Sequence, residues 1–136
     1  MKKFMIRIAT LSLLLTAATI AAQAETSWTN YKPGLVNSAL DRGETVLLGY
    51  LSSWWGTCAR QKNVLNELRA SHPKYDKSIK FVLIDWDTFS SHSVTTSRNI
   101  PRRSTLVLIK GSKEIGRLVA VTGVTEIKAF LENALK

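Results

Sequence analysis

The sequence has a single cysteine, Cys58, among its 136 residues. Disulfides within the chain are therefore excluded, and its hydrophobic core has to hold the fold without covalent cross-links. A catalytic pair of thiols within one chain is also excluded, because dithiol exchange needs one thiol to attack and a second to resolve the mixed disulfide. A lone thiol in an oxidising compartment is either buried, paired with another molecule or reactive.

Motifs for several other chemistries are missing as well. His72 and His92 are far apart in polar segments, and no spacing of Cys, His and Asp suggests a set of metal ligands. The sequence has no Gly-rich phosphate loop and no serine nucleophile elbow. We therefore predict neither a metal nor a cofactor. The formal net charge is +9, but no basic run is interleaved with aromatic residues, so we predict no nucleic-acid partner. The excess of Lys and Arg is interpreted as a solvated basic surface, with weak attraction to anionic membranes or acidic partners as the alternative.

Long apolar runs are also scarce, and the one that stands out is at the N-terminus. A basic start at residues 2–7 is followed by an apolar middle at residues 8–20 and by Ala22-Gln23-Ala24, the small-residue pattern of a cleavage site. The run is shorter than the roughly 20 residues that a transmembrane helix needs. The sequence predicts a cleaved signal peptide at residues 1–24 and one mature domain at residues 25–136. We expect this domain to be periplasmic or otherwise exported and to have no transmembrane segment.

The remaining patterns predict alternating strands and helices. In chain order they are a loop at 27–34, a helix at 35–41, a strand at 46–51, a helix after Cys58 that ends before Ser71-His72-Pro73, a strand at 80–87, a loop with one weak helix at 88–99, a strand at 104–109, a turn at 110–114, a strand at 115–121 and a helix at 124–135. Alternation that ends in a hairpin and a helix predicts an α/β fold with a central mixed four-stranded sheet flanked by helices.

The most informative stretch joins the first predicted strand to the next helix. A buried apolar run, Val46–Leu51, leads into Trp54-Trp55-Gly56-Thr57-Cys58, and a helical pattern follows. This junction resembles the active-site strand, loop and helix of the thioredoxin family, whose motif is W-C-G-P-C. Trp54 matches the Trp of that motif, Gly56 the Gly and Cys58 the second Cys. Because the order of predicted elements is also that of the family, the resemblance covers nearly all of residues 25–136 and implies a thioredoxin-like fold.

Three departures from the family motif argue against standard dithiol oxidoreductase activity. Trp55 stands in the place of the attacking Cys, and an indole has no sulfur to ionise. The family has a buried Asp in the strand, six residues before that Cys, and this chain has Gly49 there. The family also has a Pro in a cis peptide before its third strand; that position is Ser104 here, with Pro101 three residues earlier.

Cys58 is the candidate catalytic residue, and two interpretations of it stay open. As a small apolar residue at the base of the helix it would be part of the core, because free Cys is among the most buried residue types. Alternatively it is a single-thiol site whose thiolate is favoured by the helix N-terminus and by Arg60 or Arg103. It would then form mixed disulfides or be oxidised to a sulfenic acid. Monothiol relatives usually keep the first Cys of the motif, which weakens this second interpretation.

The face around the junction is the candidate binding site. Trp54 is expected to pack as an anchor, whereas Trp55 lies where the family exposes its nucleophile and is a candidate contact residue. Arg102 and Arg103 would make the same face cationic; the alternative, that they are plain solvated loop charges, stays open. The binding residues predicted from the sequence are Trp54, Trp55, Gly56, Thr57, Arg103 and Ser104. The leading hypothesis is therefore a peptide- or protein-binding protein; the alternative is a single-thiol redox protein that acts through Cys58.

Overall fold

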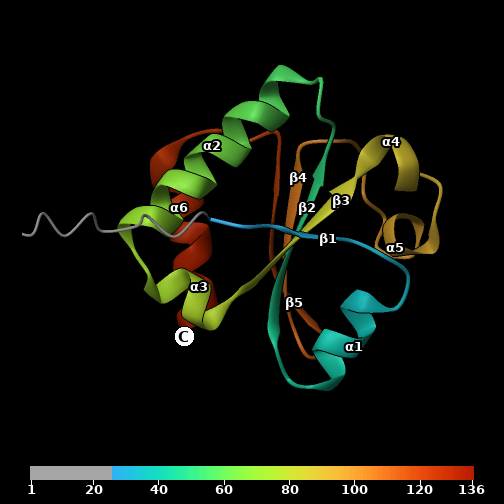
Figure 1. Ribbon diagram of the computed structural model, residues 1–136, viewed down its shortest axis with the longest axis horizontal. Helices are drawn as coiled ribbons and strands as arrows, with labels where there is room; N and C mark the ends of the chain where they lie inside the picture. Colours follow the sequence, from blue (N-terminus) through green and yellow to red (C-terminus); the bar gives the residue numbers. More distant parts are fainter. Residues whose placement is uncertain (1–25) are drawn as a thin grey trace, which may run out of the picture.

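The computed structural model describes residues 26–136, which fold around a mixed sheet of five strands (Figure 1). The predicted signal peptide, residues 1–24, lies outside the described residues. In chain order the elements are β1 (Thr29–Asn30), α1 (Leu35–Asp41), β2 (Thr45–Leu51), α2 (Gly56–Ser71), α3 (Lys74–Ser78), β3 (Lys80–Asp85), α4 (Trp86–Phe89), α5 (Ser93–Thr96), β4 (Thr105–Lys110), β5 (Lys113–Val119), α6 (Val124–Glu132) and a 3₁₀ turn at Asn133–Leu135.

The strand order across the sheet is β1-β3-β2-β4-β5, with β2 in the centre. Strands β1, β3 and β2 are parallel to one another, and β4 and β5 run antiparallel to their neighbours. The predicted mixed α/β sheet is confirmed, but the predicted count of four strands is wrong. The additional strand β1 has only two residues, which pair with Val82 and Leu83 of β3. A strand this short has no alternating pattern, so the sequence gives no local signal for it.

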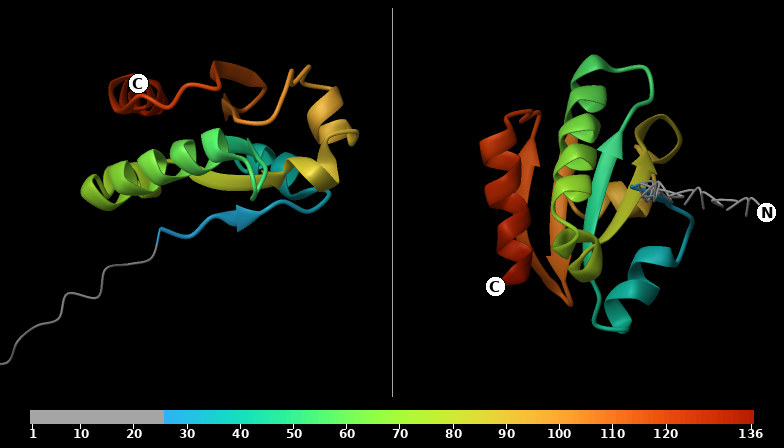
Figure 2. Two further views of the ribbon diagram at one scale, coloured as in Figure 1. Left: turned by 90° about the horizontal axis from the view of Figure 1, so that it is seen from above. Right: turned by 60° about the vertical axis from the view of Figure 1, so that its left-hand side comes forward.

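Helices cover both faces of the sheet. Figure 1 shows α2, α3 and α6 on one face and α1, α4 and α5 on the other, and Figure 2 shows α2 and α6 side by side. Alternate residues of β2 enter the two cores, with Leu47 on the α2 side and Val46, Leu48 and Tyr50 on the α1 side. Because every residue of β2 is buried, the strand reads as a continuous apolar run. Each such side chain contributes about 1.5–3 kcal/mol by its burial.

Two segments differ from the prediction for local reasons. Pro73 ends α2 as expected, but the five residues after it form the short helix α3, whose Tyr75 is buried. The third strand in chain order ends at Asp85 instead of at residue 87. The Asp85 carboxylate accepts the N–H of Asp87 at 3.3 Å and so caps α4, which begins at Trp86. Residues 88–99 therefore contain the end of α4 and the whole of α5 instead of one weak helix.

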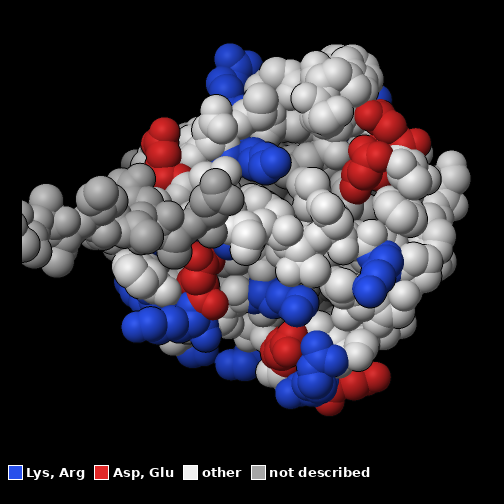
Figure 3. All heavy atoms as spheres, viewed as in Figure 1, with Lys and Arg blue, Asp and Glu red and all other residues white. Residues whose placement is uncertain are grey.

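Charged side chains are interspersed over the face seen in Figure 3. Lys, Arg, Asp and Glu are most frequent over its lower half, and the upper part carries Lys or Arg atoms at its left edge and Asp or Glu atoms at its right, with uncharged atoms between them. Within residues 26–136, no helix combines the length and the apolar character needed to cross a membrane.

Candidate functional site

The candidate site lies where β2 ends and α2 begins, at the top of Figure 1. Trp55 is the N-cap residue of α2, with an extended backbone (φ −98°, ψ 124°), and Cys58 lies in the first turn of the helix. Cys58 is on the face of α2 that also carries Gln61 and Leu65, three and seven residues later, and all three are buried. The cysteine is only 2% exposed. The helix therefore turns the one thiol of the described chain towards the core.

The thiol of Cys58 has two polar contacts. Its Sγ lies 2.7 Å from the Oγ of Ser104, and the backbone N–H of Ser52 donates to Sγ at 3.4 Å. Both serines are themselves buried. The structure thus brings Cys58 and Ser104 together, 46 residues apart in sequence, in a small polar cluster beneath the surface.

Ser104 has a left-handed backbone with φ of +62°. Such a conformation costs a non-glycine residue about 1–2 kcal/mol. It is held by three hydrogen bonds, because the Ser104 N–H donates to Tyr50 O at 2.7 Å and its carbonyl accepts from Ala120 N at 2.8 Å and from Gln61 Nε2 at 2.9 Å. No peptide bond among residues 26–136 is cis. A proline does not fit here, since its φ is fixed near −65° and it has no N–H to donate.

Gly49 lies in β2 against the indole of Trp28. A Cβ at Gly49 would be 3.0 Å from Cζ3 and 3.3 Å from Cη2 of that ring. The ring is fixed in turn, because its Nε1 donates to Asn66 Oδ1 at 2.9 Å and it packs edge-on against Phe81. The space that an acidic side chain would need at this position in the strand is therefore filled by the indole.

Two indoles and a guanidinium form the outer surface of the site. Trp54 is 62% exposed, and its ring meets the ring of Trp55 edge-on at 5.3 Å between centroids. The Arg103 guanidinium carbon lies 4.8 Å from the centroid of each ring. Cation–π contacts of this kind contribute about 0.5–1 kcal/mol at exposed sites. We call Trp54, Trp55 and Arg103 the Trp-Arg surface.

Asp87 fixes this surface from α4. Its Oδ2 accepts the Nε1–H of Trp54 at 2.8 Å, and its Oδ1 accepts the hydroxyl of Ser52 at 3.2 Å. Asp87 was not among the site residues predicted from the sequence. A usable signal was present, because β2 and β3 are parallel neighbours and residues after the carboxyl ends of such strands meet at one edge of the sheet.

An open hollow of about 470 Å³ adjoins the Trp-Arg surface. Its lining residues are Trp55, Trp86, Pro101, Arg102 and Arg103. Of the other residues predicted to bind, Gly56 is exposed and Thr57 is half-buried in the first turn of α2, whereas Ser104 is fully buried. Trp86 and Pro101 were not among the predicted site residues, and the fold brings them to the hollow from α4 and from the loop before β4.

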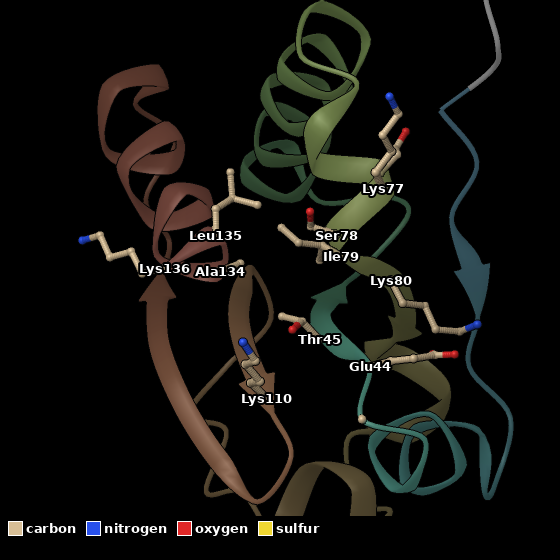
Figure 4. Close-up of a pocket in the computed structure, with 12 residues that line it drawn as sticks. Glu44, Thr45, Lys77, Ser78, Ile79, Lys80, Lys110, Ala134, Leu135 and Lys136 are labelled. Atoms are coloured by element: carbon tan, nitrogen blue, oxygen red, sulfur yellow. The ribbon is translucent and has the colours of Figure 1, made fainter.

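A second hollow, of about 670 Å³, lies at the opposite end of β2, around Thr45. Figure 4 shows that the side chains of Lys80 and Lys136 point away from its centre in opposite directions, so their charges do not converge on one ligand. Within residues 26–136 there is also no group of three His, Cys, Asp or Glu side chains placed to hold a metal ion.

Solved structures of thioredoxins and related proteins resemble this chain. "Trxlp" from Edwardsiella tarda EIB202 is 23% identical, with a TM-score of 0.69 over 77% of this chain and 98% of its own. Thioredoxin O2 from Arabidopsis thaliana is 22% identical, with a TM-score of 0.66 over 85% and 100% of the two chains. Oxidised thioredoxin from Plasmodium falciparum is 21% identical, with a TM-score of 0.63 over 78% and 96%.

Searches against family models and curated protein sequences gave no match. At these identities the structural likeness establishes the fold alone. The fold implied by the resemblance at residues 45–70 is therefore confirmed: this chain has a thioredoxin-like fold that carries a single cysteine.

Proposed function

We propose that this protein binds a peptide or a segment of another protein through the Trp-Arg surface and does not exchange dithiols. The observation that carries the proposal is a contrast between two residues four positions apart. Trp54, just before α2, is 62% exposed, whereas Cys58 in the first turn of α2 is 2% exposed and its thiol is hydrogen-bonded to Ser104. Aromatic rings and a cation are therefore accessible to a partner, whereas the sulfur of Cys58 is buried.

The composition and the rigidity of the surface support binding. Trp and Arg are the residue types most enriched at the energetic centres of protein interfaces. Trp54 is held by its hydrogen bond to Asp87 and by its contacts with Trp55 and Arg103. A side chain that is already fixed loses little conformational entropy when a partner binds, so less of the interaction energy is lost.

The same geometry disfavours dithiol chemistry. A catalytic cycle needs a thiolate that can attack a substrate disulfide and a second thiol that releases the product. Trp55 stands where the resemblance places the attacking Cys, and Trp28 fills the space beside Gly49. We expect purified protein to give no catalytic reduction of insulin with dithiothreitol as the electron donor. Turnover close to that of a dithiol thioredoxin would contradict the proposal.

Single-thiol redox chemistry at Cys58 is the second candidate function. One observation favours it, because Cys58 lies in the first turn of α2 and its Sγ accepts the backbone N–H of Ser52. A partner with its own thiol would have to resolve the mixed disulfide. The variant Cys58→Ser separates the two functions, since it abolishes every mixed disulfide but leaves the Trp-Arg surface in place.

The binding proposal is tested with a library of random peptides displayed on phage, followed by titration of synthetic peptides from the selected clones. Trp54→Ala should weaken binding at least 10-fold, because truncation of a central interface Trp commonly costs about 2 kcal/mol or more. Val124→Ala on α6, which also truncates an exposed apolar residue, is the matched control and should change nothing. The proposal fails if no peptide is selected, or if Cys58→Ser removes binding and Trp54→Ala does not.

Export is part of the same proposal. It rests on the basic, apolar and small-residue order of residues 1–24. The mass of protein recovered from the cell envelope should correspond to a chain that begins at Glu25. Recovery of the full 136-residue chain from the membrane fraction would contradict it.

A further inference from the structure

We infer that Arg103 is a carboxylate-binding residue and that the segment bound at the Trp-Arg surface carries a carboxylate next to a large apolar side chain. The inference rests on the proposed function and adds to it the chemical class of the partner. The carboxylate is that of an Asp or Glu side chain, as it is for Arg69 and Asp76 in this chain, and the experiment below distinguishes it from the C-terminus of a partner.

The first observation is that the hydrogen-bonding capacity of Arg103 is unused. No salt bridge within residues 26–136 includes Arg103, and its Nε is buried without a hydrogen-bond partner. The guanidinium carbon lies 4.8 Å from the centroid of each indole, and no hydrogen bond from the Arg103 side chain to another described residue satisfies its N–H groups. A guanidinium has five N–H donors in a planar fork that matches the two oxygens of a carboxylate.

The second observation is that the carboxylate of Asp87, beside the Trp-Arg surface, already accepts two hydrogen bonds from within the chain. Asp87 accepts hydrogen bonds from Trp54 and Ser52 and forms no ion pair with Arg103. Arg102, which is exposed and lines the same hollow, adds a second positive charge beside Arg103. Arg102 is tied to the same loop, because its Nε donates to the carbonyl of Arg103 at 3.2 Å. The surface therefore attracts an anion from outside the chain.

The third observation comes from the same chain. Arg69 also lies over two aromatic rings, those of Phe81 at 4.0 Å and Trp28 at 5.5 Å. Its guanidinium is bonded as well, because Nε donates to Asp76 Oδ1 at 2.6 Å and Nη2 to the carbonyl of Ser27 at 2.8 Å. A carboxylate and a backbone carbonyl bind two nitrogens of Arg69, and only its Nη1 is left without a partner. A peptide with an acidic residue can supply both kinds of acceptor to Arg103.

The hollow beside Arg103 accounts for the apolar part of the ligand. The indoles of Trp55 and Trp86 and the ring of Pro101 line it together with the two arginines, and its volume is about 470 Å³. A leucine or an aromatic side chain of the partner can enter there while the neighbouring carboxylate meets the guanidinium. Ligand sites commonly have this form, with an apolar wall for affinity and one or two polar groups for orientation.

The test uses three synthetic probes in which a phenylalanine has different neighbours. The first is acetyl-Gly-Gly-Glu-Phe-Gly-Gly-amide, the second has Gln in place of Glu, and the third ends in Gln-Phe with a free carboxylate. Binding to the mature protein is followed by chemical-shift changes at the Trp indole N–H groups. We expect the Glu probe to bind at least 10-fold more tightly than the Gln probe. If only the third probe gains over the Gln probe, the partner's C-terminus is the source of the carboxylate and the inference as stated is wrong.

Variants then assign the preference to one guanidinium. Arg103→Met keeps the contact with the indoles and should make the Glu and Gln probes equal, and Arg103→Lys should restore little because it lacks the fork. Arg102→Gln, which removes the adjacent exposed charge, is the matched control and should retain most of the preference. Urea midpoints confirm that each variant is folded.

Three further results would overturn the inference. Equal binding of the Glu and Gln probes by the parent protein would be compatible with the proposed function but would exclude recognition of a carboxylate. Equal losses in Arg102→Gln and Arg103→Met would mean diffuse attraction instead of a site at Arg103. Binding of a fourth probe, which has phosphoserine in place of Glu, while the Glu probe does not bind, would make the ligand a phosphopeptide. If none of the probes binds and the phage library also yields nothing, the proposed function fails together with the inference.

Discussion

Arg69 and Arg103 are each stacked on two aromatic rings, but the chain surrounds them differently. Arg69 projects from α2 and is covered by the segment at Ser27 and Trp28 and by α3, so that it is 5% exposed. Arg103 lies in the loop before β4 and stays partly exposed. The same residue types therefore build core in one region and a surface for a partner in the other. The difference lies in whether the chain itself supplies the oxygen acceptors.

The largest expected effect contrasts the two arginines directly. Arg69→Met should lower the free energy of unfolding by about 2–3 kcal/mol, because a charge-assisted hydrogen bond and a bond to a carbonyl are lost from a buried site. Arg103→Met should lower it by less than about 0.5 kcal/mol, as expected for a surface change. Urea denaturation of both variants gives the comparison. Equal losses would mean that Arg103 is structural and would remove the contrast.

A second prediction concerns the indole of Trp28, one of the two rings beneath Arg69. Gly49→Asp should destabilise the protein by about 2 kcal/mol, because the new Cβ is forced against Trp28 and a carboxylate is buried. In a Trp28→Ala background the same change should cost at least about 1 kcal/mol less, since the ring no longer occupies the space. Thermal and urea unfolding of the four proteins in this cycle provides the coupling energy. Additive effects would show that Trp28 does not fill the position.

A third prediction concerns Ser104, the buried residue that contacts Cys58 beneath the Trp-Arg surface. Ser104→Ala removes the hydroxyl beside Sγ of Cys58 and keeps the left-handed backbone, so it should cost about 1 kcal/mol. Ser104→Gly removes the same hydroxyl but relieves the backbone strain, so it should cost less than the alanine variant. The ranking of the two urea midpoints is the measurement. A glycine variant less stable than the alanine variant would mean that strain is not stored at this residue.

The smallest expected effect is a pH dependence of stability that arises where α3 contacts α6. Hydrogen bonds from Lys74 and Tyr75 lower the pKa of Glu132 to about 2, from an ordinary value of 4.5. Because this pKa is lower in the folded protein, the stabilisation is present above pH 4.5 and is lost as the pH falls from 4.5 towards 2. Glu132→Gln should therefore flatten the acid limb of the stability profile.

Arg103→Gln serves as the control for that acid limb and should leave it unchanged. The measurement is the urea midpoint at intervals between pH 2 and pH 6. An acid limb that is equally steep in Glu132→Gln and in the parent protein would show that α3 is not held to α6 through Glu132.

The parts of the fold that sequence predicted are those with a local signal. The buried run of β2 and the bounds of α1 at residues 35–41 were predicted from hydrophobic pattern and a terminating glycine, and the motif at residues 54–58 indicated the fold. The two-residue β1 and the short helix α3 were missed because their stability comes from tertiary contacts. Their patterns are too short to register as helix or strand.

Only part of the candidate site was predicted from the sequence, and its contacts were not. Trp55 and Arg103 were identified as neighbours across the junction, and Cys58 as either buried or reactive. The bond from Trp54 to Asp87 and the filling of the space at Gly49 by Trp28 depend on side chains 33 and 21 positions apart. Such pairings are decided by the relative positions of whole strands and helices. No pattern along a single segment encodes them.

The enclosure of Cys58 makes the thiol a built-in probe of how the molecule opens. A thiol reagent reaches Sγ only in molecules in which α2 has moved away from Ser52 and Ser104. When closing is fast relative to the chemical step, the labelling rate is the intrinsic rate multiplied by the equilibrium population of the open form. A single exposure to reagent in native buffer therefore reports the free energy of opening at the junction of β2 and α2, with no added dye and no denaturant.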